Sequence, residues 1–286
     1  MNIIQLSEII SNEKEVKVFL KSKGLLQDFK TCIYCSSERI DAIRRNKIKC
    51  YSCNKEWSEK QGSIFNIFRI PYKKLIMALK LFEIEISALE ASKQLEVSYN
   101  TVLKLYTLIR NALMLISDNK ALLSGEIELD ESYFGGKRKG KRGRGSQNKT
   151  PVFGILERNG KVKVEVVPDV KSDTLKNLTI QKVKRGSLIY TDTYRSYNGL
   201  VSYGFKHERI NKSYSFANGK VYINGIEGFW SYAKERLMKF HGVSKTRFPL
   251  YLKELEFRYN NRQKNMYELI LEAIVKYNEN RLGGNY

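Results

Sequence analysis

The sequence predicts a multidomain protein of the α+β and α/β classes, with a cysteine-bound module, a helical segment and a mixed sheet flanked by helices. Three observations support this prediction. Two Cys-x-x-Cys pairs lie near the N-terminus, apolar residues recur at helical spacing from Pro71 to about Met114, and strand-like alternation begins after Gly125. A chain of 286 residues is long enough for about two domains and can bury a sizeable core.

The chain is strongly basic, with 51 Lys and Arg residues against 30 Asp and Glu residues and a formal net charge of +21. Such an excess indicates a polyanionic partner and favours nucleic acid over a membrane surface. No apolar run approaches the roughly 18 residues of a transmembrane helix, and the N-terminus lacks the pattern of a secretory signal. We therefore expect no membrane association, and a cytoplasmic, nucleoid-associated location in a bacterium or a nuclear one in a eukaryote.

Residues 1–27 predict a helical lead-in, and residues 28–60 predict a zinc ribbon. The chain has four cysteines, two in each Cys-x-x-Cys pair: Cys32, Cys35, Cys50 and Cys53. Fourteen residues separate the pairs, a spacing at which two tight turns offer four thiolates to one Zn²⁺ ion. A thioredoxin-type redox role is the alternative, but it uses one pair in a βαβ setting that is absent here. Because a closed site of four thiolates leaves no open position for chemistry, we expect this zinc to be structural.

Residues 61–118 predict a helix-turn-helix DNA-binding domain. The stretch from Ser87 to Leu105 predicts two helices around a tight turn near Val97, with Ser98 as the cap of the second helix. Four residues near the start of this second helix are expected to contact DNA: Tyr99, Asn100, Thr101 and Lys104. A plain helical hairpin fits the local pattern equally well, but the net charge and the neighbouring zinc ribbon favour DNA binding.

Residues 119–286 predict the last domain, whose first elements alternate strands and helices. Their order is strand, strand, strand, helix, strand, helix, strand, helix: residues 126–134, 151–157, 161–167, 172–184, 186–192, 194–199, 205–210 and 222–234. Three antiparallel strands, a helical crossover and parallel strands at the other edge of the sheet are the order of a ribonuclease-H-like fold. Two further helices are expected before the C-terminus.

A basic loop, residues 137–149, is predicted between the first two strands of this domain. Its first nine residues include six basic side chains: Lys137, Arg138, Lys139, Lys141, Arg142 and Arg144. A charge run is usually a solvated face or linker. Because this run interrupts two strands of one sheet, we expect a flexible loop that follows a DNA phosphate backbone.

Three acidic residues fall where the predicted fold could bring them together. Asp130 lies inside the first strand, Asp192 ends the fourth, and Glu227 lies on the helix after the fifth. Grouped carboxylates repel one another unless a divalent cation is bound. Two Mg²⁺ ions about 4 Å apart would activate an attacking oxygen and stabilise a leaving one in phosphodiester chemistry. The chain has only two histidines and no P-loop motif, which argues against a histidine-rich metallohydrolase and an ATPase.

The helix over residues 222–234 allows two interpretations. Asn224 can be its N-cap, with Glu227 three residues later in a capping box, and caps are commoner than catalytic carboxylates. However, Glu227 and Lys234 are two turns apart on nearly the same face, beside an apolar stripe. With two aspartates at strand positions upstream, we favour Glu227 as a metal ligand and Asn224 as the cap.

The chain resembles bacterial insertion-sequence transposases with an N-terminal zinc ribbon, a group akin to the eukaryotic Merlin elements. Thirty-four residues separate Asp192 from Glu227, the interval familiar from D,D(34/35)E transposases and retroviral integrases. The cysteine pairs match as well, as do four further stretches: residues 128–137, 190–197, 223–234 and 256–260. Together, the matching stretches are spread over nearly the full length of the chain.

This resemblance implies a DDE-type recombinase in which Asp130, Asp192 and Glu227 hold two Mg²⁺ or Mn²⁺ ions. It also implies that Lys234 is the basic residue commonly found seven positions after the third ligand. Some members of this group have Asn as the third residue, so Asn224 stays an alternative to Glu227. The implied partners are double-stranded DNA, as terminal inverted repeats and target, and a second copy of the chain, in a homodimer or larger assembly. Two other functions stay open: a non-catalytic, domesticated DNA-binding regulator, and a nuclease of ribonuclease-H type that acts on RNA–DNA hybrids.

Overall fold

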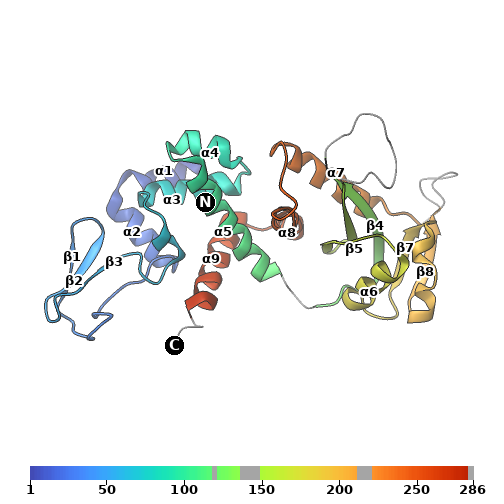
Figure 1. Cartoon of the computed structure of the whole chain (residues 1–286), viewed down its shortest axis with the longest axis horizontal. Helices are drawn as coiled ribbons and strands as arrows, with labels where there is room; N and C mark the ends of the chain where they lie inside the picture. Colours follow the sequence, from blue (N-terminus) through green and yellow to red (C-terminus); the bar gives the residue numbers. More distant parts are fainter. Residues whose placement is uncertain (118–120, 136–148, 211–220, 283–286) are drawn as a thin grey trace. The chain divides into compact units, whose positions relative to one another are not determined.

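A computed structural model describes residues 1–117, 121–135, 149–210 and 221–282 of the chain (Figure 1). The chain divides into two compact units. Unit 1 comprises residues 1–116 and 264–286, and unit 2 comprises residues 117–263. Among the described helices, none is both long enough and apolar enough to cross a membrane.

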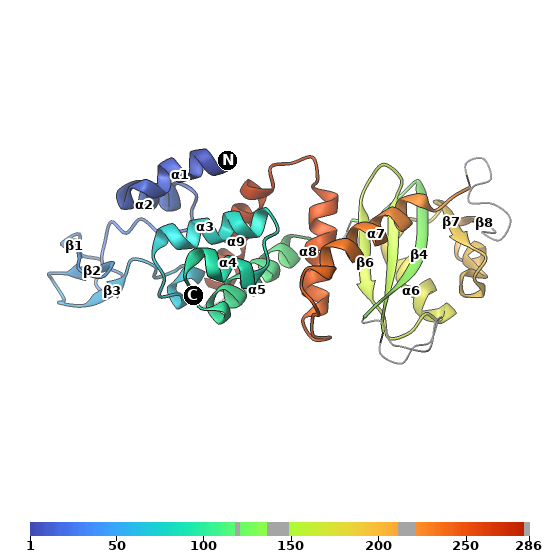
Figure 2. The same ribbon diagram turned by 90° about the horizontal axis from the view of Figure 1, so that it is seen from above.

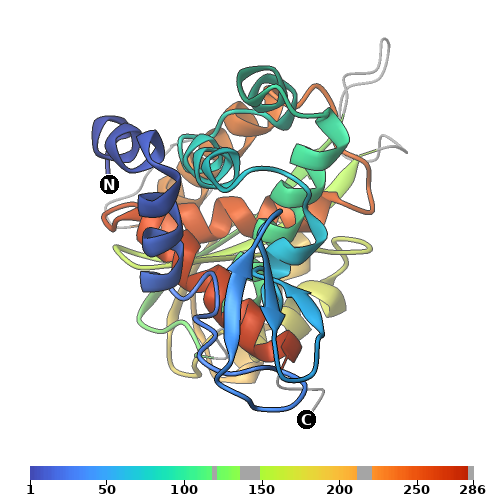
Figure 3. The ribbon, with the colours of Figure 1, turned by 90° about the vertical axis from the view of Figure 1, so that its left-hand side faces the viewer.

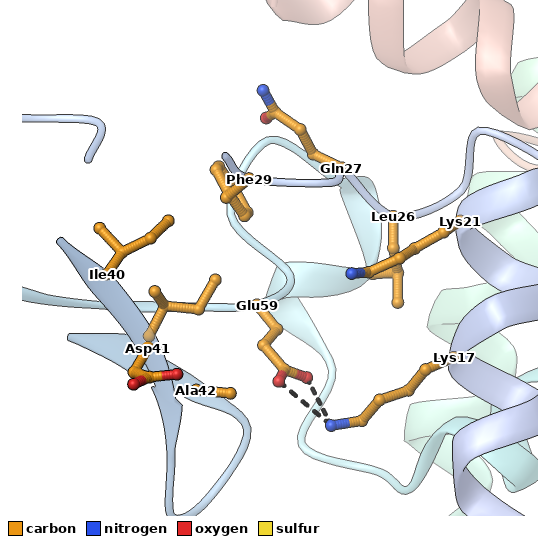
Figure 4. A pocket seen from close by; sticks show the side chains of 10 residues that line it. Lys17, Lys21, Leu26, Gln27, Phe29, Ile40, Asp41, Ala42 and Glu59 are labelled. Carbon is orange, nitrogen blue, oxygen red and sulfur yellow. Dashed lines mark hydrogen bonds and ion pairs between the residues drawn. The ribbon is translucent and has the colours of Figure 1, made fainter. Parts of the chain in front are cut away.

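Unit 1 begins with two short helices and a three-stranded antiparallel sheet, which face the viewer in Figure 3. These elements are α1 (Ile3–Ser11), α2 (Glu13–Ser22), β1 (Ile40–Ile43), β2 (Lys47–Cys50) and β3 (Glu56–Ser58). The core beside this sheet is small and is built from buried Cys32, Cys50 and Trp57, against which Phe29 packs edge-on. Figure 4 shows a pocket between α2 and β1, where Lys17 forms a 2.8 Å ion pair with Glu59.

The rest of unit 1 is helical. Its elements are the 3₁₀-helix η1 (Ile64–Ile67), α3 (Tyr72–Glu83), α4 (Ala88–Leu95), α5 (Tyr99–Ser117) and α9 (Met266–Leu282). Helices α4 and α5 are joined by three residues, of which Glu96 takes the left-handed conformation at φ 50°. The Ser98 hydroxyl accepts a hydrogen bond from the Thr101 amide at 3.3 Å, so Ser98 caps α5 as predicted.

Helix α9 belongs to unit 1, which differs from the expected domain of residues 119–286. The Asn278 side chain accepts a 2.8 Å hydrogen bond from the Ile64 amide, and Glu268 pairs with Lys23 at 2.8 Å. Its apolar face, including Ile270, is buried in this unit. The amphipathic pattern predicts the helix, but it carries no information about which apolar surface the helix covers.

Unit 2 is built on a five-stranded mixed sheet of order β6-β5-β4-β7-β8. The strands are β4 (Glu126–Phe134), β5 (Thr150–Glu157), β6 (Val162–Val166), β7 (Leu188–Asp192) and β8 (Lys206–Ile210). Strands β4, β5 and β6 pair antiparallel, whereas β7 is parallel to β4 and β8 is parallel to β7. The predicted mixed sheet, with three antiparallel strands followed by two parallel ones, is confirmed.

Helices cover both faces of this sheet. They are α6 (Ser172–Lys182), α7 (Asn224–Met238) and α8 (Phe248–Asn260), with the 3₁₀ turns η2 (Arg195–Tyr197) and η3 (Leu200–Tyr203). Side chains alternate along β4, so that Leu129 lies in the core beside α6, whereas Phe134 lies in the core beside α7. Helix α7 crosses the sheet over β4 and β5, and α8 packs on β6 (Figure 2).

Candidate active site and metal centre

Asp130 and Asp192 lie at equivalent places on neighbouring parallel strands. The register pairs Glu128 of β4 with Tyr190 of β7, and each aspartate follows two residues farther along its strand. Because residues two apart share a face, both aspartates lie on the face that α7 covers. The structure therefore brings these two predicted site residues to one end of adjacent strands.

The segment after β7 contacts both Asp192 and strand β4. One Asp192 carboxylate oxygen accepts a 2.9 Å hydrogen bond from the Tyr194 amide. The hydroxyl of Tyr197 donates to Glu131 at 2.7 Å. Complete burial raises the pKa of Tyr197 well above its ordinary value, and the negative charges of Glu131, Asp130 and Asp192 add to this effect. Both aspartates are thus close enough to Tyr197 for their charges to act on it.

Gly154 lets α7 approach the sheet beside Asp130. It lies opposite Asp130 in the β4–β5 ladder. A Cβ atom at this position would stand 2.5 Å from the Trp230 ring and 2.8 Å from Ile226, too close for any side chain. In the space that glycine leaves, the Trp230 indole N–H donates a 3.1 Å hydrogen bond to the Asp130 carboxylate. In the sequence, Trp230 is a member of the apolar stripe of the helix over residues 222–234, which gives no indication of this hydrogen bond.

Glu227 and Lys234 share the flank of α7 on the side of Asp130. On the other flank, Phe229 packs edge-on against Tyr259 of α8, with ring centroids 5.2 Å apart. At 100° per residue, Glu227 and Lys234 point about 140–160° away from Phe229. The Lys234 ammonium lies 5.9 Å from the centre of the Phe134 ring, beyond Asp130 on β4. Glu227 is half-buried, and Lys234 is exposed.

The three carboxylates do not form a closed metal cage. In the part of the chain that the structure describes, the four cysteines are the only group of three or more candidate ligands whose ligand atoms all lie within 4.8 Å of one another. Asp130, Asp192 and Glu227 nevertheless offer hard oxygen ligands from three separate elements. Such a donor set suits Mg²⁺, which prefers oxygen and usually keeps several of its water ligands.

The predicted capping role of Asn224 is wrong. Asn224 is the first residue of α7 and is exposed, while Ile223 occupies the N-cap position without a side-chain capping bond. Instead, the buried carboxylate of Glu128 on β4 accepts a 2.9 Å hydrogen bond from the Ile226 amide. A carboxylate there satisfies a helix N–H and interacts favourably with the helix dipole. The sequence gives no local signal for this cap, because it comes from a strand 98 positions earlier.

Arg158, just after β5, is the main residue of this region that sequence reasoning missed. Its guanidinium donates to Glu128 at 2.9 Å, to Glu126 at 2.6 Å and to the Tyr222 carbonyl at 2.8 Å. It also lies between two aromatic rings, 3.8 Å from the centre of Tyr190 and 3.9 Å from that of Tyr222. Burial lowers the pKa of Arg158, but the hydrogen bonds and charges of the two glutamates outweigh burial and raise this pKa.

The four cysteine sulfurs form the second candidate site. All four lie within 4.8 Å of one another, with Cys32 and Cys53 3.6 Å apart and Cys35 and Cys50 3.6 Å apart. Burial opposes ionisation of Cys50, but the backbone N–H groups of Cys53 and Ser52 lower its pKa to about 6 and favour the thiolate that binds metal. The predicted cluster of four cysteines is confirmed, and its chemistry suits Zn²⁺.

The predicted DNA-contacting residues divide into two sets. Tyr99, Asn100 and Lys104 are exposed at the start of α5, while Thr101 is half-buried and its hydroxyl shares a 2.8 Å hydrogen bond with Ser98. The six basic residues of the predicted loop lie outside the described residues: Lys137, Arg138, Lys139, Lys141, Arg142 and Arg144.

Comparisons with known proteins give the family. Residues 122–260 match the ISXO2-like transposase domain. An "Uncharacterized transposase-like protein" of Haemophilus influenzae is 49% identical over 116 residues, which cover 41% of this chain and 94% of that protein. An "Uncharacterized protein in transposable element ISH50" of Halobacterium salinarum is 26% identical over 254 residues, which cover 79% of this chain and 85% of that protein.

Among solved structures, the Mos1 strand transfer complex matches at 12% identity over 73% of this chain and 77% of that one, with a TM-score of 0.29. This structural similarity is too low to support an argument, so the family is established by sequence. The chain belongs to the family of insertion-sequence transposases that carry the ISXO2-like transposase domain.

Proposed function

We propose that this transposase cuts and joins DNA at the ends of its element, with Asp130, Asp192 and Glu227 as ligands of two Mg²⁺ or Mn²⁺ ions. The observation that carries the proposal is the placement of the two aspartates at equivalent positions of adjacent parallel strands, on the sheet face covered by the helix that bears Glu227. When bound, two such ions would activate the attacking oxygen and stabilise the leaving oxygen of a phosphodiester.

The neighbouring side chains have supporting roles in this proposal. The Trp230 indole holds one oxygen of Asp130 and so fixes the direction of that carboxylate. Lys234, exposed on the same flank as Glu227, is placed to attract a DNA phosphate. Asn224 is the alternative third ligand, but a carboxylate is the better ligand for Mg²⁺.

The N-terminal half supplies DNA recognition in the same proposal. Residues 28–60 form a structural zinc ribbon, and residues 61–118 form a helix-turn-helix domain. Tyr99, Asn100, Thr101 and Lys104 would then read the terminal inverted repeats, and the basic residues of 137–149 would follow the phosphate backbone. The catalytic domain, within residues 119–286, would have a ribonuclease-H-like fold. Because two ends must be paired, the active assembly would be a homodimer or larger.

The test is Mg²⁺-dependent cleavage of a DNA duplex that carries the element's end. Asp130→Asn, Asp192→Asn and Glu227→Gln should each abolish cleavage, because each removes a charged ligand while it preserves side-chain shape. A mobility-shift assay should show that end binding survives in all three variants. The matched control is Asp173→Asn, in the first turn of α6, which should cut like the unmodified protein.

Two other results would change the assignment. If Glu227→Gln still cuts and Asn224→Ala does not, then Asn224 is the third ligand. If the unmodified protein binds end DNA but never nicks or joins it with Mg²⁺ or Mn²⁺, the protein is a DNA-binding regulator and the catalytic proposal fails.

A further inference from the structure

The side chain of Arg158 contacts all three segments that carry the proposed metal ligands. Glu128 lies two residues before Asp130, and Tyr190 lies two residues before Asp192. Tyr222, which stacks on the guanidinium and accepts its third hydrogen bond, lies five residues before Glu227. These segments come from β4, β7 and the approach to α7, which are far apart in sequence.

The contacts of Arg158 go to residues that precede the proposed metal ligands along the chain, and not to the ligands themselves. Residues two apart on a strand are separated by roughly 7 Å along it, because each residue advances about 3.3 Å. The guanidinium is also engaged by two carboxylates, a carbonyl and two rings, and its side chain is only 11% exposed. Its influence must therefore pass through the segments that it holds together.

The start of α7 depends on this arrangement through Glu128. One oxygen of Glu128 accepts from Arg158, and the other accepts from the Ile226 amide, the residue before Glu227. A Cβ atom on Gly225 would lie 2.9 Å from the Glu128 carboxylate, which shows how closely the first turn of α7 approaches it. Glu128 is 1% exposed, so its charge would be costly to bury without the guanidinium.

We propose that Arg158 is a positioning residue of the active site, which fixes the first turn of α7 against β4 and β7 and thereby sets the place of Glu227 relative to Asp130 and Asp192. This inference depends on the proposed function for the identity of the metal ligands. The contacts of Arg158 that support it do not depend on that function.

Lysine cannot replace the guanidinium in this role. A planar fork can donate to Glu128, Glu126 and the Tyr222 carbonyl while it stacks between two rings, whereas an ammonium on a flexible stem cannot do both. Arg158→Lys should therefore keep the charge and loosen the first turn of α7. Glu128→Gln should also loosen the first turn of α7, because it keeps the side-chain shape but removes the charge that pairs with Arg158.

The experiment compares the full-length unmodified protein with Arg158→Lys, Glu128→Gln and a matched control, Arg262→Lys. Arg262 also stacks on a tyrosine, 4.5 Å from the Tyr259 ring, and donates to its carbonyl at 2.8 Å, but it is exposed. Hydrogen exchange of residues 222–230 is measured first, without added Mg²⁺ or Mn²⁺ and with the zinc retained. Mn²⁺ binding is then measured by calorimetry, and DNA cleavage is measured across a range of Mg²⁺ concentrations.

We expect faster exchange at residues 222–230 in Arg158→Lys and Glu128→Gln, and no change in Arg262→Lys. Mn²⁺ affinity should fall by about 10-fold or more, the usual effect of removing an outer-shell partner of a metal site. The Mg²⁺ concentration for half-maximal cleavage should rise by a similar factor, with end binding unchanged. If Arg158→Lys fails to fold, Glu128→Gln decides the outcome.

Unchanged exchange at residues 222–230 together with unchanged Mn²⁺ affinity would overturn the inference. So would faster exchange spread evenly over unit 2 with a lower melting temperature, since that result describes general stability and not positioning. Failure of the unmodified protein to cut DNA would instead count against the proposed function. The exchange result without Mg²⁺ or Mn²⁺ would still report on the start of α7.

Discussion

Helix α7 approaches the sheet closely at Gly154. Gly154→Ala would push a methyl group into the side chains of Trp230 and Ile226, so these side chains must move, and we expect α7 to shift away from β5 with them. We expect a loss of about 1–3 kcal/mol in the free energy of unfolding, the usual cost of overpacking a core. The shift should also lengthen the hydrogen bond between Trp230 and Asp130. Chemical denaturation measures the loss, and tryptophan fluorescence reports the change around Trp230.

The matched control is Gly228→Ala on α7 itself, where an added Cβ meets nothing within 4 Å. Because alanine is the better helix former, this variant should be more stable by about 1 kcal/mol. A Gly154→Ala protein as stable as the unmodified chain would show that α7 can move away from β5 without cost.

At the residue scale, the sequence predicts the strand positions of two candidate ligands but not the long-range contacts that surround them. The strand positions of Asp130 and Asp192 were predicted correctly, because strand alternation and strand ends are visible in the local pattern, while their role as metal ligands stays a prediction. The cap of α7 and the contacts of Arg158 join positions up to 98 residues apart, and no local pattern encodes such pairs. The cap of α7 was therefore predicted at Asn224, whereas Glu128 provides it.

At the element scale, the cysteine module has too small a core to hold its own fold. Its buried apolar side chains are Cys32, Cys50 and Trp57, two of which are candidate zinc ligands. The free energy that stabilises such a module normally comes from the metal. The module should therefore lose its three-stranded sheet when the metal is removed.

We expect metal analysis of the purified protein to find one zinc ion per chain at the cluster of four cysteines. A strong chelator, or Cys53→Ser, should accelerate hydrogen exchange in β1, β2 and β3 while the sheet of unit 2 keeps its protection. Ser52→Ala, one residue away, is the control and should keep both the zinc and the protection. Unchanged exchange after complete loss of zinc would contradict a structural role for the metal.

Individual elements were the best predicted part of the fold. Alternation identified the strands of unit 2, and Asn159-Gly160 between β5 and β6 is a dipeptide typical of a tight hairpin turn. Ser98 was correctly identified as the cap of α5, because its partner Thr101 is three residues away. These successes share one cause: the interactions that define each element are local.

At the scale of the whole molecule, the chain completes unit 1 with its last helix. After unit 2 ends at Gln263, α9 returns to the N-terminal unit. The apolar face of α9 contributes five fully or almost fully buried side chains: Tyr267, Ile270, Leu271, Ala273 and Ile274. Periodicity predicted this helix, but its partner depends on which apolar surface the rest of the fold leaves uncovered.

Removal of residues 264–286 should therefore destabilise the N-terminal unit and leave the sheet of unit 2 folded. The truncation exposes the surface that α9 covers and removes the acceptor for the Ile64 amide on Asn278. In the full-length chain, Ile270→Ala should lower the free energy of unfolding of unit 1 by about 2–5 kcal/mol, as is usual for truncation of a buried aliphatic side chain. Glu272→Ala, at an exposed position of α9, should cost nothing measurable.

Segment-resolved hydrogen exchange distinguishes the two units in these variants. Faster exchange in α3 and η1, with unchanged protection in β4 and β5, would match the buried contacts of α9. Because the proposed recognition residues of α5 belong to unit 1, the truncated protein should also bind end DNA more weakly. Full protection of α3 after the truncation would show that unit 1 folds without α9, and the C-terminal helix would then need another explanation.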